Sequence, residues 1–132
     1  MSNELYWLAA TLLLTACMAV PYTLNRIAVR GLMGAMANPS PADKPQSDWA
    51  RRAQAAHANA IENLAVFAPA AIAVHVANLG NSVTATACMV YFFARLAHYL
   101  VYTGGIPVLR TLAHTVGVFA MLALILRLLG AL

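Results

Sequence analysis

The chain has 132 residues, of which 62% are hydrophobic and only 9% charged, and its mean hydropathy is +0.72. Soluble domains carry roughly 25% charged residues, and a soluble protein this short leaves too much surface exposed to hide so much apolar area. Composition therefore excludes a soluble globular domain and predicts an integral membrane protein. The net charge of +4 comes without a basic run interleaved with aromatic residues, so it does not indicate nucleic-acid binding.

Four apolar stretches are long enough to cross a bilayer, which takes roughly 20 residues in a helix. The first, at about residues 5–24, carries no charge, and no basic segment precedes it as in a cleaved signal peptide. The others lie at about residues 60–79, 83–102 and 108–129. Open strands are excluded because their edges would be unpaired in lipid, and the alternation of a membrane barrel is absent. We therefore predict an all-α fold, an integral membrane four-helix bundle.

Proline, glycine and asparagine mark the three connections. The segment ANPSPADKP at residues 37–45 contains three prolines, which cannot continue a helix. NLGNS at 78–82 and TGGIP at 103–107 are short turns. The sequence thus predicts a single domain over residues 1–132, with helices at about 4–36, 48–79, 82–103 and 107–131. The first two helices extend beyond the hydrocarbon.

Basic residues indicate the orientation. Seven of the eight lysines and arginines lie on or near the first and third connections, which face the same side of the membrane in a chain with four spans. Only Arg127 belongs to the other side. The positive-inside rule predicts that the basic side is cytoplasmic, with both termini on the opposite side.

Polar side chains in the predicted helices fall on shared faces, because they are three, four or seven residues apart. They are Arg52, Asn59 and Glu62 in the second helix, and Arg95, His98, Tyr99 and Tyr102 in the third. Arg30 closes the first helix and Arg110 opens the fourth, so all four helices bring polar groups to the cytoplasmic end. Charges inside membrane helices usually face the protein interior or a polar cavity. One interpretation is a basic pocket for an anionic polar ligand, whose carboxylates arginines hold well.

A purely structural interpretation stays open beside it. Glu62 could pair with Arg95 or Arg110 and only fix the helix register, and Tyr99 and Tyr102 could form an aromatic belt at the membrane interface. No pair of the four histidines has metal-ligand spacing on one helix face, so no metal site is predicted. The two cysteines are interpreted as packing residues.

Four segments resemble the MAPEG family, the membrane-associated proteins in eicosanoid and glutathione metabolism. RAQAAHANAIENLAVF at 52–67 resembles its second-helix signature, in which Arg, His, Asn and Glu are followed by an aromatic residue. ANP at 37–39, RLAHYLVY at 95–102 and PVLRT at 107–111 resemble its first loop, its third-helix motif and the start of its fourth helix. The resemblance covers nearly the whole chain, in order and at compatible spacing.

This resemblance implies a homotrimer of four-helix protomers that binds glutathione, as a co-substrate, between neighbouring protomers near the cytoplasmic face. The residues that match positions holding glutathione or shaping its pocket are Arg30, Arg52, Asn59, Glu62, Arg95, His98, Tyr102 and Thr111. Arg110 matches the catalytic arginine that in several members lies beside the glutathione sulfur, where it would stabilise the thiolate. The implied function is a glutathione-dependent transferase or peroxidase-like protein acting on lipophilic electrophiles, in a bacterial inner membrane.

Two departures leave an alternative open. Ala55 and His114 stand where some enzymes of the family have a second arginine and a tyrosine. They argue against a specialised prostaglandin or leukotriene synthase and favour a non-catalytic subunit or scaffold, as part of a larger membrane complex. A small multidrug exchanger is a weaker alternative, because those proteins depend on a carboxylate within the first span, where this chain has none.

Overall fold

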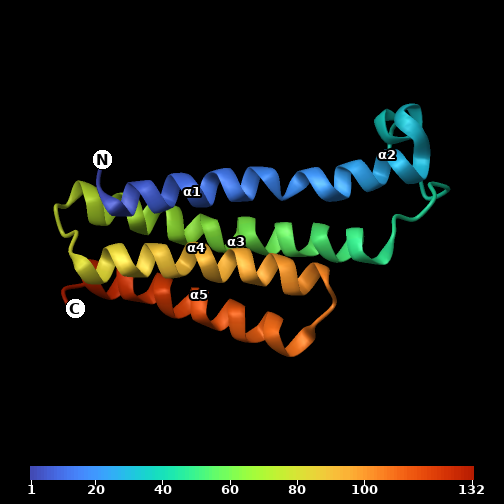
Figure 1. Cartoon of the computed structure of the whole chain (residues 1–132). Helices are drawn as coiled ribbons and strands as arrows, with labels where there is room; N and C mark the ends of the chain where they lie inside the picture. The colour runs from blue at the N-terminus through green and yellow to red at the C-terminus, as the bar shows by residue number, and fades with distance from the viewer.

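A computed structural model describes all 132 residues and contains helices, turns and loops. The helices are α1 (Asn3–Cys17), α2 (Ala19–Met36), α3 (Asp48–Val76), α4 (Ser82–Thr103) and α5 (Pro107–Leu128). Because α1 and α2 follow one another along one rod, the five helices form an up-and-down bundle of four rods (Figure 1). Both termini and the α3–α4 turn lie at one end, and the α2–α3 loop and the α4–α5 turn lie at the other. The all-α fold class predicted from the sequence is confirmed.

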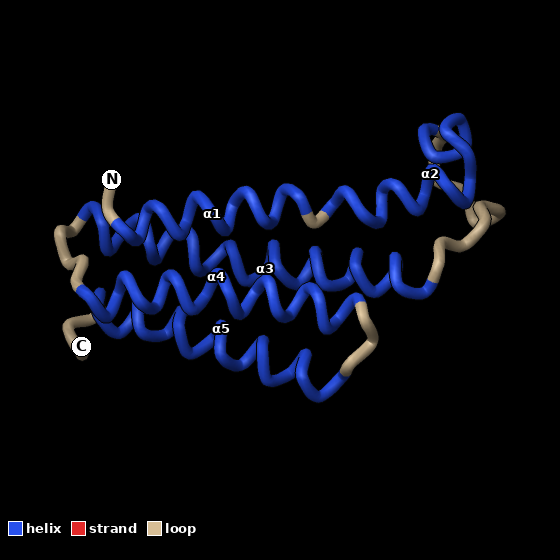
Figure 2. The backbone as a smooth tube through the Cα atoms, in the orientation of Figure 1, coloured by secondary structure: helices blue, strands red, loops and turns tan.

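The first rod differs from the continuous helix predicted for residues 4–36. α1 gives way to α2 at Met18, and within α2 the backbone of Gly31 leaves the helical region, with φ 74° and ψ 165°. That conformation is essentially restricted to glycine. The chain therefore turns sharply near the end of α2, as the tube in Figure 2 shows.

Two helices, α3 and α5, end earlier in the chain than predicted, and each is followed by a residue in the left-handed conformation. α3 stops at Val76 and α5 at Leu128, where residues 79 and 131 were expected. Asn78 has a φ of 56° and Gly130 a φ of 77°, and residues in this conformation commonly terminate helices.

Three of the four rods are long and apolar enough to cross a bilayer, namely Asn3–Met36, Asp48–Val76 and Pro107–Leu128. The fourth rod, α4, is less apolar because it carries Arg95, His98 and several hydroxyl groups. Both Arg95 and His98 are buried inside the bundle, so α4 keeps its charged and polar groups away from lipid. This placement is the usual one for an ionisable residue in a membrane helix.

Two clusters of buried side chains hold the bundle together. In the larger cluster, Phe67 on α3 stacks on Tyr91 on α4 with their ring centroids 3.7 Å apart. In the smaller cluster, Tyr99 donates a hydrogen bond of 3.0 Å to the carbonyl of Met18 and packs near small residues of α3 such as Ala56. Small residues allow membrane helices to approach closely. Arg95 lies one helical turn from both Tyr91 and Tyr99, so it separates the two clusters along α4.

Candidate functional site

A small polar cavity lies near the end of the bundle that carries the α2–α3 loop, where α3, α4 and α5 meet. Its volume is about 200 Å³, and it is lined by Asn59, His98, Tyr102, Arg110, Thr111 and His114. Five of these six side chains belong to the candidate site chosen from the sequence. Residues that are up to 55 positions apart in the chain, from Asn59 to His114, thus face one space.

Helix geometry explains why these residues meet. His98 and Tyr102 are four residues apart on α4, so they lie one above the other on the same face. Gly105, with a φ of 79°, reverses the chain immediately after α4. Pro107 then occupies the first turn of α5, a favourable place because proline has no N–H to leave unpaired. Arg110 therefore follows within one turn and lies beside the end of α4.

Arg110 is held against an aromatic ring and has no charged partner. Its guanidinium carbon lies 4.5 Å from the centre of the Tyr102 ring, which is a cation–π contact. The two ion pairs of the chain are Arg30–Asp43 and Arg51–Asp48, so Arg110 forms none. The N–H groups of this half-buried guanidinium are therefore available to an anionic ligand in the cavity.

Arg95 does not line the cavity, but it contacts two residues that do, Asn59 and His98. It is 2% exposed, and its Nη2 donates a hydrogen bond of 2.7 Å to Oδ1 of Asn59 and lies 3.2 Å from Nδ1 of His98. Its Nε has no hydrogen-bond partner. The pairing of Glu62 with Arg95 or Arg110, which the sequence left open, does not form within the chain. A buried cation compensated only by neutral groups favours an anion nearby.

Histidines line the inner wall. The ring of His98 lies edge-on to Tyr102, with centroids 5.5 Å apart, and its centroid is 6.0 Å from that of His114. Nδ1 of His114 is buried without a hydrogen-bond partner. From the sequence, His114 was expected only as a departure from the family and not as a cavity residue. Its position four residues after Arg110 on the same helix was the signal that could have placed it there.

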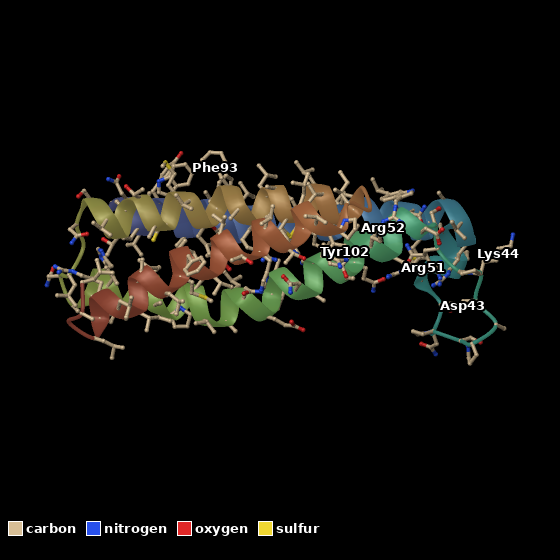
Figure 3. The ribbon with its side chains drawn as sticks, turned by 90° about the horizontal axis from the view of Figure 1, so that it is seen from below. Asp43, Lys44, Arg51, Arg52, Phe93 and Tyr102 are labelled. Atoms are coloured by element: carbon tan, nitrogen blue, oxygen red, sulfur yellow. The ribbon has the colours of Figure 1, made fainter.

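The remaining candidate residues lie outside this cavity. Arg52 donates from Nε to the carbonyl of Thr103 at 3.0 Å, so it connects α3 to the C-terminal end of α4. Arg30 donates from Nε to the carbonyl of Lys44 at 2.8 Å and lies 3.7 Å from Asp43. Figure 3 shows Arg52 and Tyr102 along the bundle, with Asp43 and Lys44 out on the α2–α3 loop.

Glu62 and Thr111 are both exposed on the surface of one chain. Glu62 makes no ion pair within the chain, although it lies only three residues after Asn59 on α3. Thr111 is on the cavity rim and donates to the carbonyl of Pro107 at 3.3 Å. An exposed carboxylate within an apolar helix is unfavourable wherever it faces lipid.

The MAPEG family model matches residues 5–130, nearly the whole chain. The chain belongs to the MAPEG family. This MAPEG protein is therefore an integral membrane bundle, and membership supports a glutathione-related role in general. No curated protein and no solved structure matches the chain.

Proposed function

We propose that this MAPEG protein is a membrane-bound glutathione-dependent transferase or peroxidase-like enzyme that acts on lipophilic electrophiles. The observation that carries the proposal is the guanidinium of Arg110, which lines the cavity, is fixed over Tyr102 and has no ion pair within the chain. A cation placed in this way lowers the pKa of a thiol beside it and so favours the nucleophilic thiolate.

The residues present suit the groups of glutathione, which has two carboxylates, an ammonium, two amides and a thiol. Arginines bind carboxylates through charge-assisted hydrogen bonds. The Nη groups of Arg52 can take this role, and Arg30 can do so by exchanging its Asp43 partner for a ligand carboxylate. The amide of Asn59 can bind a peptide group, and Glu62 can bind the ammonium. With the thiol at Arg110, both carboxylates, the ammonium, the thiol and one amide of the tripeptide have a chemically matched side chain.

The cavity of one chain is too small for a complete site. Its volume of about 200 Å³ lies below the range of roughly 300–1,000 Å³ that small-molecule pockets usually have. Arg30 and Glu62 lie outside it, and the Glu62 carboxylate is exposed on an apolar helix. These facts support assembly as a homotrimer in which a neighbouring protomer completes each site.

The chemistry follows from the thiolate. In transfer, the glutathione sulfur forms a bond to an electrophilic carbon, and the leaving group departs with the electron pair of the broken bond. In peroxide reduction, the sulfur attacks one peroxide oxygen and the O–O bond breaks, which releases an alcohol. A second glutathione then displaces the oxygen as water and forms the disulfide. In both reactions Arg110 stabilises the attacking thiolate, while the surrounding bilayer supplies the lipophilic substrate.

The proposal includes an orientation in a bacterial inner membrane. The α2–α3 loop and the α4–α5 turn lie at the same end of the bundle as the Arg110 cavity (Figure 1). Seven of the eight basic residues belong to this end, which the positive-inside rule assigns to the cytoplasm. Glutathione is a cytoplasmic thiol, so this orientation exposes the site to its substrate.

Glutathione binding and conjugation by the purified protein test the proposal. We expect the parent to bind glutathione and to conjugate it to a chlorodinitrobenzene probe. Arg110→Ala should lower kcat/KM on the order of 100-fold, the loss typical of removing one group that stabilises developing negative charge. Glu62→Ala should weaken glutathione binding. Arg127→Ala, which removes an arginine from the opposite end of the bundle, serves as the control. The proposal is contradicted if the parent does not bind glutathione, or if binding and turnover are unchanged in both Arg110→Ala and Glu62→Ala.

A second candidate is a non-catalytic MAPEG-fold subunit or scaffold. The observation that favours it is His114, which lines the cavity where some enzymes of the family carry a tyrosine, together with Ala55 in place of a second arginine. In that case the protein should co-purify with a larger membrane complex and show no thiol transfer. Purification of the chain alone with glutathione-conjugating activity excludes this alternative.

A further inference from the structure

A second polar cavity is lined by residues of the N-terminal segment and of the α3–α4 turn. These segments lie at the end of the bundle opposite the α4–α5 turn (Figure 1). The volume of the cavity is about 460 Å³, and only one of its nine lining residues, Ala85, is hydrophobic. The side chains that matter here are Glu4 from α1, His75 and Asn78 from the end of α3, and Asn81 before α4. A space this polar excludes a purely lipophilic occupant.

Glu4 is built into the wall of this cavity. The residue is 4% exposed, and its Oε1 accepts a hydrogen bond of 2.5 Å from the hydroxyl of Thr84. Gly80 lies so close that a Cβ there would be 3.0 Å from Oε1, so the turn fits tightly against the carboxylate. Oε2 accepts no hydrogen bond from the protein and is free to bind a ligand.

Glu4 forms no ion pair with a cation of the chain. The ion pairs of the structure are both at the other end of the bundle, at Asp43 and Asp48. Arg127 is at the same end as Glu4, but it donates from Nε to the carbonyl of Leu79 at 2.9 Å and from Nη1 to that of Leu132 at 2.8 Å. A buried carboxylate without a cation is costly, and in a membrane protein it commonly marks a binding site.

We propose that this cavity binds a primary ammonium group, carried either by a small polar amine or by the headgroup of an aminophospholipid. An ammonium offers three N–H donors and no acceptor, which matches the Glu4 carboxylate and the carbonyl oxygens of the asparagine side chains. The volume lies within the usual range for a small-molecule site, roughly 300–1,000 Å³. One carboxylate is too few for a tight calcium or magnesium site, and the chain has no group of three metal-ligating side chains.

The lipid source is included because of a neighbouring groove. An apolar groove of about 540 Å³ lies between α4 and α5 and shares Ser82 with the polar cavity. Val90, Val116 and Phe119 are among its lining residues. A lipid with its ammonium at Glu4 thus has an apolar path for an acyl chain beside its headgroup. The site is at the opposite end from Arg110 and does not rest on the proposed glutathione chemistry.

The test uses the full chain, purified in detergent, with ethanolamine as the free amine and choline as its comparison. Choline carries the same charge but has no N–H donor, so we expect it to bind at least about tenfold more weakly than ethanolamine. Glu4→Gln, which keeps the shape of the side chain, should reduce ethanolamine affinity by a similar factor. Asp43→Asn makes the same change of charge at the other end and should leave the affinity unchanged.

The lipid arm uses native mass spectrometry of protein taken from nanodiscs that contain phosphatidylethanolamine and phosphatidylcholine in equal amounts. If the parent retains phosphatidylethanolamine and the Glu4→Gln variant does not, the lipid headgroup is the ligand. Binding of ethanolamine without lipid retention assigns the free amine. No preference for either primary amine over its quaternary counterpart, or full binding by a folded Glu4→Gln variant, overturns the proposal.

A second variant protects the test against misfolding of Glu4→Gln. Asn3 is exposed and lines the cavity, so Asn3→Lys places an ammonium of the protein itself beside Glu4. This variant should fold and lose the binding of both amines, whereas Asn3→Ala should retain it. Normal amine binding by Asn3→Lys overturns the proposal.

Discussion

The side chain of Asn59 on α3 accepts a hydrogen bond of 2.7 Å from the buried guanidinium of Arg95 on α4, and the same side chain lines the Arg110 cavity. Arg95 has no carboxylate partner, so the amide oxygen of Asn59 carries much of the compensation for its charge. Asn63 donates in turn to Oδ1 of Asn59 at 3.3 Å. The packing of α3 against α4 and the shape of the candidate site therefore depend on one amide.

We expect Asn59→Leu to destabilise the bundle by about 1.5–3 kcal/mol, the usual contribution of a hydrogen bond to a charged group. Asn59→Asp keeps an acceptor oxygen and adds an opposite charge, so it should be at least as stable as the parent. Thermal unfolding in detergent, followed by circular dichroism, measures the difference. Equal unfolding temperatures for the two variants would show that Arg95 does not depend on this bond.

Tyr102 should act on catalysis through Arg110. Tyr102→Phe keeps the ring under the guanidinium, whereas Tyr102→Leu removes a cation–π contact that contributes about 0.5–2 kcal/mol. We expect kcat/KM for glutathione conjugation to fall in Tyr102→Leu and to change little in Tyr102→Phe. A larger loss in Tyr102→Phe than in Tyr102→Leu would assign the effect to the hydroxyl group instead.

The sequence predicted the helices and the confirmed fold class because apolar runs and prolines carry a strong local signal. It placed His98 and Tyr102 together because residues four apart share a helix face. It grouped Asn59 with them because the polar groups of all the predicted helices lie toward the same end of the bundle. The turn at Gly31 was missed, since a single glycine inside a helical pattern is usually tolerated there.

The positions of Arg30 and Glu62 could not be predicted in the same way. Spacing along one helix shows which residues share a face, but it does not show which neighbour that face meets. Arg30 lies against the α2–α3 loop because Gly31 turns the chain directly after it. Glu62 is only one helical turn from Asn59, but Asn59 lines the cavity whereas Glu62 lies outside it and is exposed.

Gly31→Ala should destabilise the protein by about 1–3 kcal/mol, the usual cost of a side chain in this backbone region. No atom lies within 4 Å of the added Cβ, so the loss would come from the backbone and not from a clash. Gly130→Ala is the matched control, because it also has a positive φ and open space but lies at the C-terminal end, where the chain can relax. Thermal unfolding of both variants checks this, and equal losses would contradict the assigned role of the turn.

The proposed orientation predicts where the C-terminus lies. A C-terminal alkaline phosphatase fusion, which is active only outside the cytoplasm, should be active in a bacterial host. A fusion placed in the α2–α3 loop after Pro41 should be inactive. The opposite pattern would place the Arg110 cavity on the outer side of the membrane and remove its access to cytoplasmic glutathione.

The proposed trimer makes a prediction about mixed assemblies. Arg30 contacts the α2–α3 loop of its own chain and does not line the Arg110 cavity, so the proposed trimer has it serve the glutathione site of a neighbouring protomer. Arg30→Ala and Arg110→Ala should each lower activity when expressed alone. When the two variants are co-expressed, a mixed trimer contains some sites with both arginines intact, and activity should recover in part.

The control for that experiment is the double variant Arg30→Ala with Arg110→Ala, co-expressed with the parent at the same ratio. If Arg30 and Arg110 of one site come from different chains, many sites in the mixture combine one parent chain with one double-variant chain and lack an arginine. Activity should then fall below the value expected from the fraction of parent chains. If both arginines come from one chain, every parent chain keeps an intact site, and activity should equal the value expected from the fraction of parent chains. The two co-expressed single variants should then show no recovery. The two mixtures therefore distinguish a site between protomers from a site within one bundle, because each arrangement predicts the opposite result in each mixture.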